Sequence, residues 1–365
     1  MRDEHPLAAW LRLTLTPEIG GETQRKLLTA FGLPETVYAA GREAVRRVIG
    51  SRADLLFDFC PDEAVDRSIA WAETPGQHIV TLADTAYPPA LLQIPDPPTL
   101  LYVRGRLEVL QSPTLGIVGS RNATPQGLRN AEDFARTLAA AGLTIASGLA
   151  LGIDGAAHRG ALAARGTTIA VIGTGADRVY PARHKELALV IAEQGAIVSE
   201  FPLGTPVMPH HFPRRNRLIA GLSLGVLVVE AAPESGSLIT ARLATEQGRE
   251  VFAIPGSIHS PLSRGCHRLL KQGAKLVECA ADILDELAPQ LASPPAREAS
   301  PTTCTAQTES GAPILQALGH DPCSFDDLAV RTGLSADRLT AGLLELELAG
   351  HLALLPGNRY QRLTD

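Results

Sequence analysis

The sequence of 365 residues has few aromatic residues, no excess of positive charge and no long apolar run. Aromatic residues make up only 4%, so leucine, valine, isoleucine and alanine must build the core. The 33 basic residues are outnumbered by 39 acidic ones, which argues against a surface covered all over by nucleic acid. The absence of a run of about 18 apolar residues predicts that the chain does not span a membrane.

The cysteines form no recognisable pattern, because no C-x-x-C pair occurs among them. An odd number at irregular spacing is typical of reduced thiols inside a cell. The first residues, MRDEHPLAAWLRLTL, carry acidic charges and lack the apolar core of a secretion signal. The sequence therefore predicts a cytoplasmic protein. The five cysteines are Cys60, Cys266, Cys279, Cys304 and Cys323.

Several catalytic and cofactor signatures are missing. No G-x-x-x-x-G-K-[ST] occurs, GIVGSR has the wrong spacing for a dinucleotide fingerprint, and GTGADR lacks its third glycine. Ser147 and Ser237 do not lie in a G-x-S-x-G turn, which argues against a serine hydrolase. His210 and His211 have no third ligand at zinc-like spacing, so we predict no metal site and no cofactor.

The chain divides into four segments that differ in composition and in predicted secondary structure. Residues 1–80 are helix-like, and TPEIGGETQRKLLTAFG has the pattern of a helix-hairpin-helix, although a simple packing domain explains it equally well. Residues 81–288 begin with a proline-rich connector and continue as the main domain. The Pro, Ser, Thr and Ala content of 289–312 predicts a disordered linker. Residues 313–365 read as three helices and a hairpin, which is a winged helix.

The main domain has the pattern of a doubly wound α/β sheet. Seven short apolar runs bounded by glycine alternate with amphipathic stretches, as buried parallel strands alternate with helices. Ligands bind such sheets at the carboxyl ends of the strands, where the strand order reverses. The stretches GIVGSRNATPQG, SGLALGIDGAAHRG, GTGADRVYPARH and EAAPESGSLITA follow four of the strands. Glycine-rich turns before helix N-termini predict an anion-binding rim.

The most concentrated positive charge lies in GTPVMPHHFPRRNRLIAGLS, residues 204–223, which contains no acidic residue. Its arginines can bind phosphate, Arg121 ends the first strand of the rim, and Phe212 offers a ring for stacking a base. The alternative is a solvated helix face. Asp154 and His158 lie four residues apart on one helix face, which favours a structural ion pair over a catalytic pair.

These motifs, together with SEFPLGTPVMPHHFPRRNRLIAGLS, VVEAAPESGSLITARLATEQGREVFAIPG and GCHRLLKQGAKLV, closely resemble the bacterial DNA-processing protein A family, DprA or Smf. The resemblance implies an extended Rossmann-like fold, no enzymatic activity and binding of single-stranded DNA. It also implies loading of RecA during natural transformation, contact with single-strand-binding protein, and a homodimer.

The resemblance implies that the DNA pocket lies around the GSR arginine and the F-P-x-R-N-R segment. The dimer surface would include His267, Leu270 and Leu276. The predicted DNA-binding residues are Gly119, Ser120, Arg121, Thr124, Gly148, Gly152, Asp154, His158, Gly173, Gly175, His210, Phe212, Arg214, Arg215, Asn216, Arg217, Ser235, Gly236 and Ser237.

Two points depart from this interpretation. Related Rossmann-type folds include nucleotide-processing enzymes of the lysine-decarboxylase-like group, whose P-G-G-x-G-T-x-x-E stretch is only echoed by ESGSLITARLATE, so an enzyme or a nucleotide sensor remains the alternative. The winged helix has an acidic excess, with Asp337, Glu345 and Glu347 on its presumed recognition helix. Helices that enter a DNA groove are normally basic, which favours a protein-contact or autoregulatory role.

Overall fold

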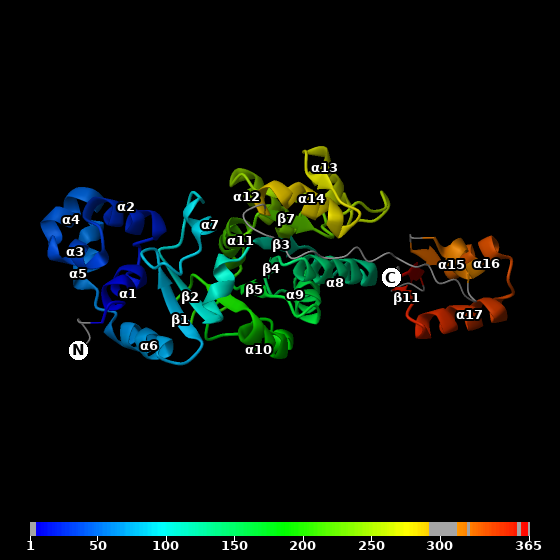
Figure 1. Cartoon of the computed structure of the whole chain (residues 1–365), viewed down its shortest axis with the longest axis horizontal. Helices are drawn as coiled ribbons and strands as arrows, with labels where there is room; N and C mark the ends of the chain where they lie inside the picture. The colour runs from blue at the N-terminus through cyan, green and yellow to red at the C-terminus, as the bar shows by residue number, and fades with distance from the viewer. Residues whose placement is uncertain (1–4, 292–311, 320–321, 356–358, 364–365) are drawn as a thin grey trace.

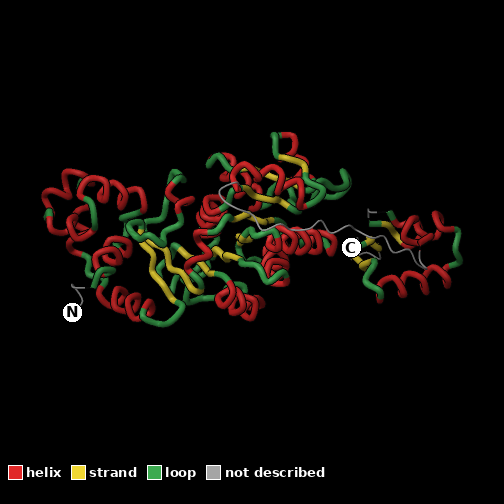
Figure 2. The backbone as a smooth tube through the Cα atoms, in the orientation of Figure 1, coloured by secondary structure: helices red, strands yellow, loops and turns green. Residues whose placement is uncertain are grey.

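The computed structural model describes residues 5–291, 312–319, 322–355 and 359–363. A helical domain and a winged-helix domain lie at opposite ends of a central α/β domain (Figure 1). The predicted fold class is confirmed: the central domain carries a large, mostly parallel sheet between layers of helices (Figure 2).

The helical domain packs six short helices around its own core. The second helix ends where Gly32 adopts a φ of +86° and donates its N–H to the Leu28 carbonyl, as the glycine in the sequence predicts. Buried side chains from successive helices, among them Leu13, Leu27 and Val45, form one apolar cluster. The helices are α1 (Ala8–Leu15), α2 (Gly21–Phe31), α3 (Pro34–Ala39), α4 (Arg42–Ile49), α5 (Arg52–Asp58) and α6 (Asp62–Ala72).

The central sheet has nine strands in the order β1-β2-β6-β5-β4-β3-β7-β8-β9. All seven strands predicted from the apolar runs are present, as β3 to β9, and they pair in parallel. The strand order reverses at β3, which lies between β4 and β7. The strands are β1 (Gln77–Thr81), β2 (Leu100–Gly105), β3 (Thr114–Val118), β4 (Thr144–Ser147), β5 (Thr168–Val171), β6 (Ala196–Ser199), β7 (Gly225–Val228), β8 (Glu250–Ala253) and β9 (Lys275–Leu276).

The first two strands extend the sheet beyond the predicted parallel core. β1 pairs antiparallel with β2, and β2 pairs antiparallel with β6. The sequence pattern predicts helices up to residue 80, so strand β1 differs from the prediction. A five-residue strand gives too short a pattern to be recognised, and its place at the sheet edge depends on a partner that lies elsewhere in the chain.

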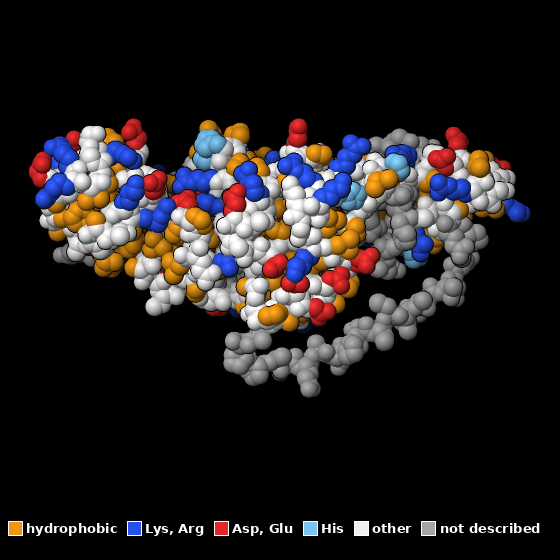
Figure 3. All heavy atoms as spheres, turned by 90° about the horizontal axis from the view of Figure 1, so that it is seen from above, with side chains coloured by type: hydrophobic (Ala, Val, Ile, Leu, Met, Phe, Trp, Pro, Cys, Tyr) orange, Lys and Arg blue, Asp and Glu red, His pale blue; other side chains and the backbone are white. Residues whose placement is uncertain are grey.

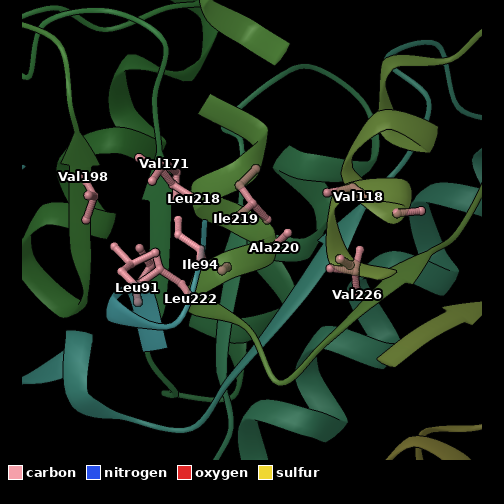
Figure 4. Close-up of a cluster of buried hydrophobic side chains, with 14 of the residues drawn as sticks. Leu91, Ile94, Val118, Val171, Val198, Leu218, Ile219, Ala220, Leu222 and Val226 are labelled. Atoms are coloured by element: carbon pink, nitrogen blue, oxygen red, sulfur yellow. The ribbon is translucent and has the colours of Figure 1, made fainter. Parts of the chain in front are cut away.

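Helices cover both faces of the sheet. One face packs against α7 (Pro89–Leu92), α11 (His211–Leu222), α12 (Gly236–Glu246) and α13 (Arg264–Lys271). Figure 4 shows Leu218, Ile219 and Leu222 of α11 between the sheet and the side chains of Leu91 and Ile94. The other face packs against α8 (Pro125–Ala140), α9 (Ile153–Ala163), α10 (Lys185–Gln194) and α14 (Ala280–Leu291). The 3-10 turns are Leu107–Gln111 and Ala182–His184.

The C-terminal domain contains the helices and hairpin strands that the sequence predicts. The expected turn at Pro-Gly-Asn and most of the expected linker lie outside the described residues, although α14 continues to Leu291, past the predicted start of the linker. The elements are α15 (Ala312–Leu318), β10 (Cys323–Ser324), α16 (Phe325–Thr332), α17 (Ala336–Leu348), β11 (Leu352–Leu355) and β12 (Arg359–Arg362).

Candidate nucleic-acid interface

A pocket of about 840 Å³ opens where the strand order reverses, at the carboxyl ends of β3 and β7. This is the place where doubly wound sheets bind ligands. Ten of the predicted DNA-binding residues line it, from the β3 loop, from α11 and from the first turns of α9 and α12. They are Gly119, Ser120, Arg121, Asp154, Phe212, Arg215, Asn216, Ser235, Gly236 and Ser237.

The loop after β3 is fixed by very close backbone packing. A Cβ on Gly119 would lie 2.6 Å from the Ile153 side chain, and a Cβ on Gly152 would lie 2.2 Å from the Ser120 carbonyl oxygen. Gly152 also has a φ of +78°, which side-chain-bearing residues rarely adopt. The Ile153 N–H donates to the Ser120 carbonyl at 3.1 Å. Both glycines therefore serve to lock two loops together beside the pocket.

Thr124 supports this loop from behind and does not line the pocket. Its hydroxyl caps α8 by accepting the Gly127 N–H at 2.9 Å, and it also donates to Glu230 at 2.5 Å. The Thr124 N–H donates to the other Glu230 oxygen at 2.9 Å. Burial raises the pKa of the Glu230 carboxyl, and the bonds from Thr124 partly oppose that effect. Thr124 thus holds the β3 loop onto the end of β7.

Arg121, Phe212 and Tyr180 form the exposed part of the pocket. The Arg121 guanidinium lies over the Phe212 ring, 4.9 Å from its centre, and the Tyr180 ring centre lies 6.1 Å from that of Phe212. Arg121 is exposed and makes no ion pair within the described part of the chain. The group offers a cation for a phosphate and two ring faces for a base.

The start of α12 forms the opposite wall. Ser235 caps the helix, and its hydroxyl lies 2.7 Å from that of Ser237. The Asn216 side chain donates to the Gly236 carbonyl at 3.3 Å, which ties α11 to this turn. A Cβ on Gly236 would meet nothing within 4 Å, so the backbone there faces open space. The first turn of this eleven-residue helix lines the pocket, and the partial positive charge of a helix N-terminus favours an anion there.

Arg215 does not act as a free phosphate ligand in this structure. It is 3% exposed, it donates to the Val171 carbonyl, and its guanidinium lies where a Cβ on Gly148 would be. Burial lowers the pKa of Arg215 to about 10, against the opposing effect of Asp154. Asp154 in turn accepts the Gly148 N–H at 3.1 Å, and burial raises the pKa of its carboxyl. The two groups form the charged floor of the pocket.

Arg214 and Arg217 lie on another side of α11 from the pocket, which differs from the prediction that the arginine run faces the rim. Arg214 pairs with Glu200 at 3.2 Å, and Arg217 pairs with both Glu200 and Asp96. A helix turns about 100° per residue, so the arginines point to different surroundings. The spacing of the arginines in the sequence does not reveal which of them form ion pairs with carboxylates.

His158 is a core residue. It is fully buried, its Nδ1 lies 2.7 Å from the Thr168 hydroxyl, and burial lowers the pKa of its ring to about 3. The expected ion pair with Asp154 is wrong, because Asp154 accepts hydrogen bonds from backbone amides of the loop between β4 and α9. The apolar surroundings decide the outcome, since they disfavour the charged imidazole.

The remaining predicted residues lie around the pocket. A Cβ on Gly173 would meet His211 and Phe212 at ordinary van der Waals distance, whereas a Cβ on Gly175 would clash with the 202–204 turn. His210 is exposed, and its ring packs against the ring of His211. Burial lowers the pKa of His211, and its Nδ1 lies 3.0 Å from the Gly173 carbonyl oxygen.

Several lining residues were not predicted, of which Tyr180 matters most. The signal available in the sequence was an aromatic residue at the end of the glycine-rich stretch GTGADRVYP. Val207 and Pro209 also line the pocket, from the start of the arginine-rich stretch 204–223, and Leu262 lines it from a loop that the sequence motifs did not mark. Within the described ranges, we find no group of three metal-ligating side chains and no helix suited to crossing a membrane.

The predicted dimer residues lie near the β9 edge of the sheet. Leu276 is 52% exposed, Leu270 is half-buried on α13, and the His267 ring bonds to the Gly256 carbonyl at 2.9 Å. Ile258, on the neighbouring loop, is 73% exposed. The two-residue strand β9 pairs with β8 and forms the end of the sheet.

Comparisons with known proteins agree with this architecture. A family model described as DNA recombination-mediator protein A matches residues 78–288, and a DprA winged helix domain model matches residues 292–358. Protein Smf of Escherichia coli K12 is 46% identical over 307 residues, covering 83% of this chain and 82% of that protein.

Two solved structures are similar. That of DNA processing protein A from Streptococcus pneumoniae has a TM-score of 0.69 and 37% identity, covering 77% of this chain and 98% of that one. That of DNA processing protein A from Helicobacter pylori, described for its single-stranded DNA binding mode, has a TM-score of 0.53 and 32% identity, covering 58% of this chain and 96% of that one.

The fold and the pocket define a Rossmann-like α/β protein with a pocket at its switch point and a winged helix attached. The matching family model covers more than half of the chain, and the E. coli relative covers most of it. The chain belongs to the DNA recombination-mediator protein A family, DprA or Smf. The family resemblance seen in the sequence is confirmed.

Proposed function

We propose that the switch-point pocket binds a short stretch of single-stranded DNA and that the protein acts as a recombination mediator, not an enzyme. The observation that carries the proposal is the exposed Arg121 guanidinium over the Phe212 ring, with Tyr180 beside them. A base stacks on either ring while its phosphate meets Arg121 and the α12 N-terminus. The single-stranded DNA binding described for the H. pylori relative supports the proposal.

The shape of the site favours an unpaired strand. A base within a duplex is stacked on both sides and must be flipped out before it can enter a concave pocket. Stacking on Phe212 or Tyr180 is available to every base, so we expect little sequence preference. Basic and acidic side chains are interspersed on the face seen in Figure 3, which suits a local contact better than a long charged track.

A binding assay tests the proposal against the enzyme or nucleotide-sensor alternative. Fluorescence anisotropy with a labelled oligo-dT strand is expected to give a submicromolar Kd that rises steeply with salt, because bound phosphates release counterions. Thymidine monophosphate is expected to compete poorly and to remain intact by chromatography. Equal affinity for the mononucleotide, or its turnover, would instead support the nucleotide-processing alternative.

We also propose a homodimer through the β9 edge and α13. Exposed Leu276 and Ile258 lie beside half-buried Leu270 and provide apolar area that a partner would cover. Two pockets on one dimer would raise the avidity for long strands over short ones. Light scattering is expected to show a dimer that Leu276→Asp converts to a monomer. The monomeric variant should bind a long strand with reduced affinity. Its affinity for a strand too short to reach from one pocket to the other should be unchanged.

Loading of RecA in natural transformation is the cellular role that we propose. RecA-dependent strand exchange on strands precoated with single-strand-binding protein, with and without this chain, tests it directly. We expect faster exchange with the chain present.

The acidic winged helix, with Leu348 of α17 81% exposed, is proposed to contact protein and not DNA. Its deletion should therefore leave the affinity for oligo-dT unchanged.

A further inference from the structure

A line of ion pairs connects the helical domain to the helix that carries Phe212. Arg25 of α2 pairs with Asp96 at 2.6 Å and donates to the Pro97 carbonyl at 2.9 Å. Asp96 pairs with Arg217 of α11 at 3.2 Å through its other oxygen. Glu200 then joins Arg217 to Arg214, one turn earlier on the same helix. These five charged groups link three segments that are distant in sequence.

The centre of this network is removed from water. The Glu200 side chain is 3% exposed and that of Arg217 is 11% exposed, whereas Arg25 and Asp96 are partly open to solvent. Within the described residues, Glu200 Oε1 and Arg217 Nη1 are buried without a hydrogen-bond partner. A buried charge with incomplete hydrogen bonding depends strongly on each ion pair that it does make. The arrangement of Arg217 is therefore sensitive to Asp96.

The same connector that carries Asp96 also packs closely on α11. A Cβ on Gly221 would lie 2.8 Å from an Ile94 methyl carbon and 2.9 Å from a Leu91 methyl carbon, so the connector and α11 are in direct contact (Figure 4). The helical domain makes a second contact here, because the Thr99 hydroxyl donates to Gln24 of α2. α11 is thus held by the connector, and the connector by α2.

Phe212 lies in the same first turns of α11 as Arg214 and Arg217. A helix of twelve residues moves as a unit, so a shift at Arg217 moves the Phe212 ring relative to Arg121. The network contacts α11 on a different side from the pocket, and Arg25 does not line that pocket. Its influence on the pocket must therefore pass through the position of α11.

We propose that Arg25 is a positioning residue through which the helical domain sets α11, and with it the stacking surface of the DNA pocket. The inference rests on the proposed function, since strand affinity is one of its readouts. The helical domain then acts as a brace for the site without touching the strand.

Arg25→Ala is the test variant, Arg25→Lys is the conservative rescue, and Lys26→Ala is the matched control. Within the described part of the chain, the one ion pair of Lys26 is with Glu22 of the same helix, and its side chain is 62% exposed. We expect Arg25→Ala to weaken oligo-dT binding roughly two- to thirtyfold, the range of coupling through side-chain networks, with Arg25→Lys in between. Lys26→Ala should bind like wild type.

Two readouts separate positioning from direct contact. Loss of a phosphate ligand would lower the slope of log K against log salt by about one, whereas a positioning effect leaves the slope unchanged. In a Phe212→Ala background, Arg25→Ala should have little further effect, because coupled residues are not additive. A reduced salt slope, or full additivity with Phe212→Ala, would overturn the inference.

Hydrogen exchange on the protein without DNA tests the positioning role of Arg25 independently of strand binding. Arg25→Ala should speed exchange of the backbone amides of α11, and Lys26→Ala should not, because opening of α11 needs no ligand. If wild type fails to bind oligo-dT but this difference is seen, the proposed function fails and the brace stands. Equal exchange in the two variants refutes the brace whatever the strand affinity.

Discussion

The guanidinium of Arg121 lies over the ring of Phe212 at 4.9 Å. Arg121 follows β3 and Phe212 begins α11, so the contact joins the two sides of the switch point. Neither residue is committed to the core, since Arg121 is exposed and Phe212 half-buried. The contact therefore holds a cation and an aromatic face ready for a ligand, at a place where the rest of the pocket is fixed by packing.

Replacing Arg121 by alanine is expected to weaken oligo-dT binding by about tenfold or more. The change removes the exposed cation that we propose as a phosphate ligand, and the slope of log K against log salt should fall by about one. Exposed side chains contribute little to folding, so the free energy of unfolding should change by less than about 0.5 kcal/mol. Anisotropy titrations at several salt concentrations and urea unfolding measure the two quantities. Arg47→Ala, an exposed arginine of the helical domain, is the control that should bind normally.

Replacing Arg217 by alanine is expected to destabilise the protein instead of only removing a DNA contact. Glu200 would remain buried without its main ion-pair partner, which typically costs about 3–5 kcal/mol. The double change Arg217→Met and Glu200→Met should recover much of the lost free energy of unfolding, because it removes both charges and leaves neither partner buried alone. Urea unfolding gives the free energies. An Arg217→Ala protein as stable as wild type, with weakened strand binding, would restore the direct-contact interpretation.

Gly152 and Gly236 should respond differently to the same change. Gly152→Ala places a Cβ 2.2 Å from the Ser120 carbonyl at a φ of +78°, and a cost of roughly 1–3 kcal/mol is expected. Gly236→Ala meets open space and should be nearly neutral for folding. Thermal unfolding of both variants checks the contrast. Equal melting temperatures would mean that the β3 loop is not locked as described.

The buried imidazole of His158 predicts a loss of stability in acid. Its pKa is about 3 in the folded protein and about 6.5 when unfolded, so below pH 6.5 only the unfolded chain takes up the proton. The contribution is complete above pH 6.5 and decreases as pH falls, by about 2 kcal/mol at pH 5. Urea unfolding from pH 8 to pH 5 measures it.

The matched variant isolates this effect from other titrating groups. His158→Asn cannot take up a proton in this range, so its free energy of unfolding should depend less on pH than that of wild type. Buried Asp154, Glu200 and Glu230 have raised pKa values, which act in the opposite direction and are common to both proteins. Parallel pH curves for the two proteins would contradict the assignment.

The strand runs and glycine turns predicted the parallel sheet and the location of the pocket, because both depend on local patterns. Apolar runs of four or five residues identify buried strands, and residues such as Ser120 and Ser235 follow them directly. Tyr180 and the edge strand β1 were missed, since their roles depend on residues brought near by folding. The partners of the arginines could not be predicted for the same reason. Asp96 lies in a connector that gives no sign of being near α11, and the pairing of Glu200, which lies shortly before α11 in the sequence, depends on how the loop between them folds.

The sequence by itself determined the fold class, the family and the edge of the sheet that carries the site, because short-range periodicity and ordered motifs encode them. Only the tertiary structure decided which cations are available. Arg121 is left exposed, whereas Arg215 and Arg217 are buried, and Arg217 pairs with Asp96 of the connector and with Glu200 after β6. Charge in a sequence is a property of the residue, but its availability depends on burial and on pairing, which exist only once the chain has folded.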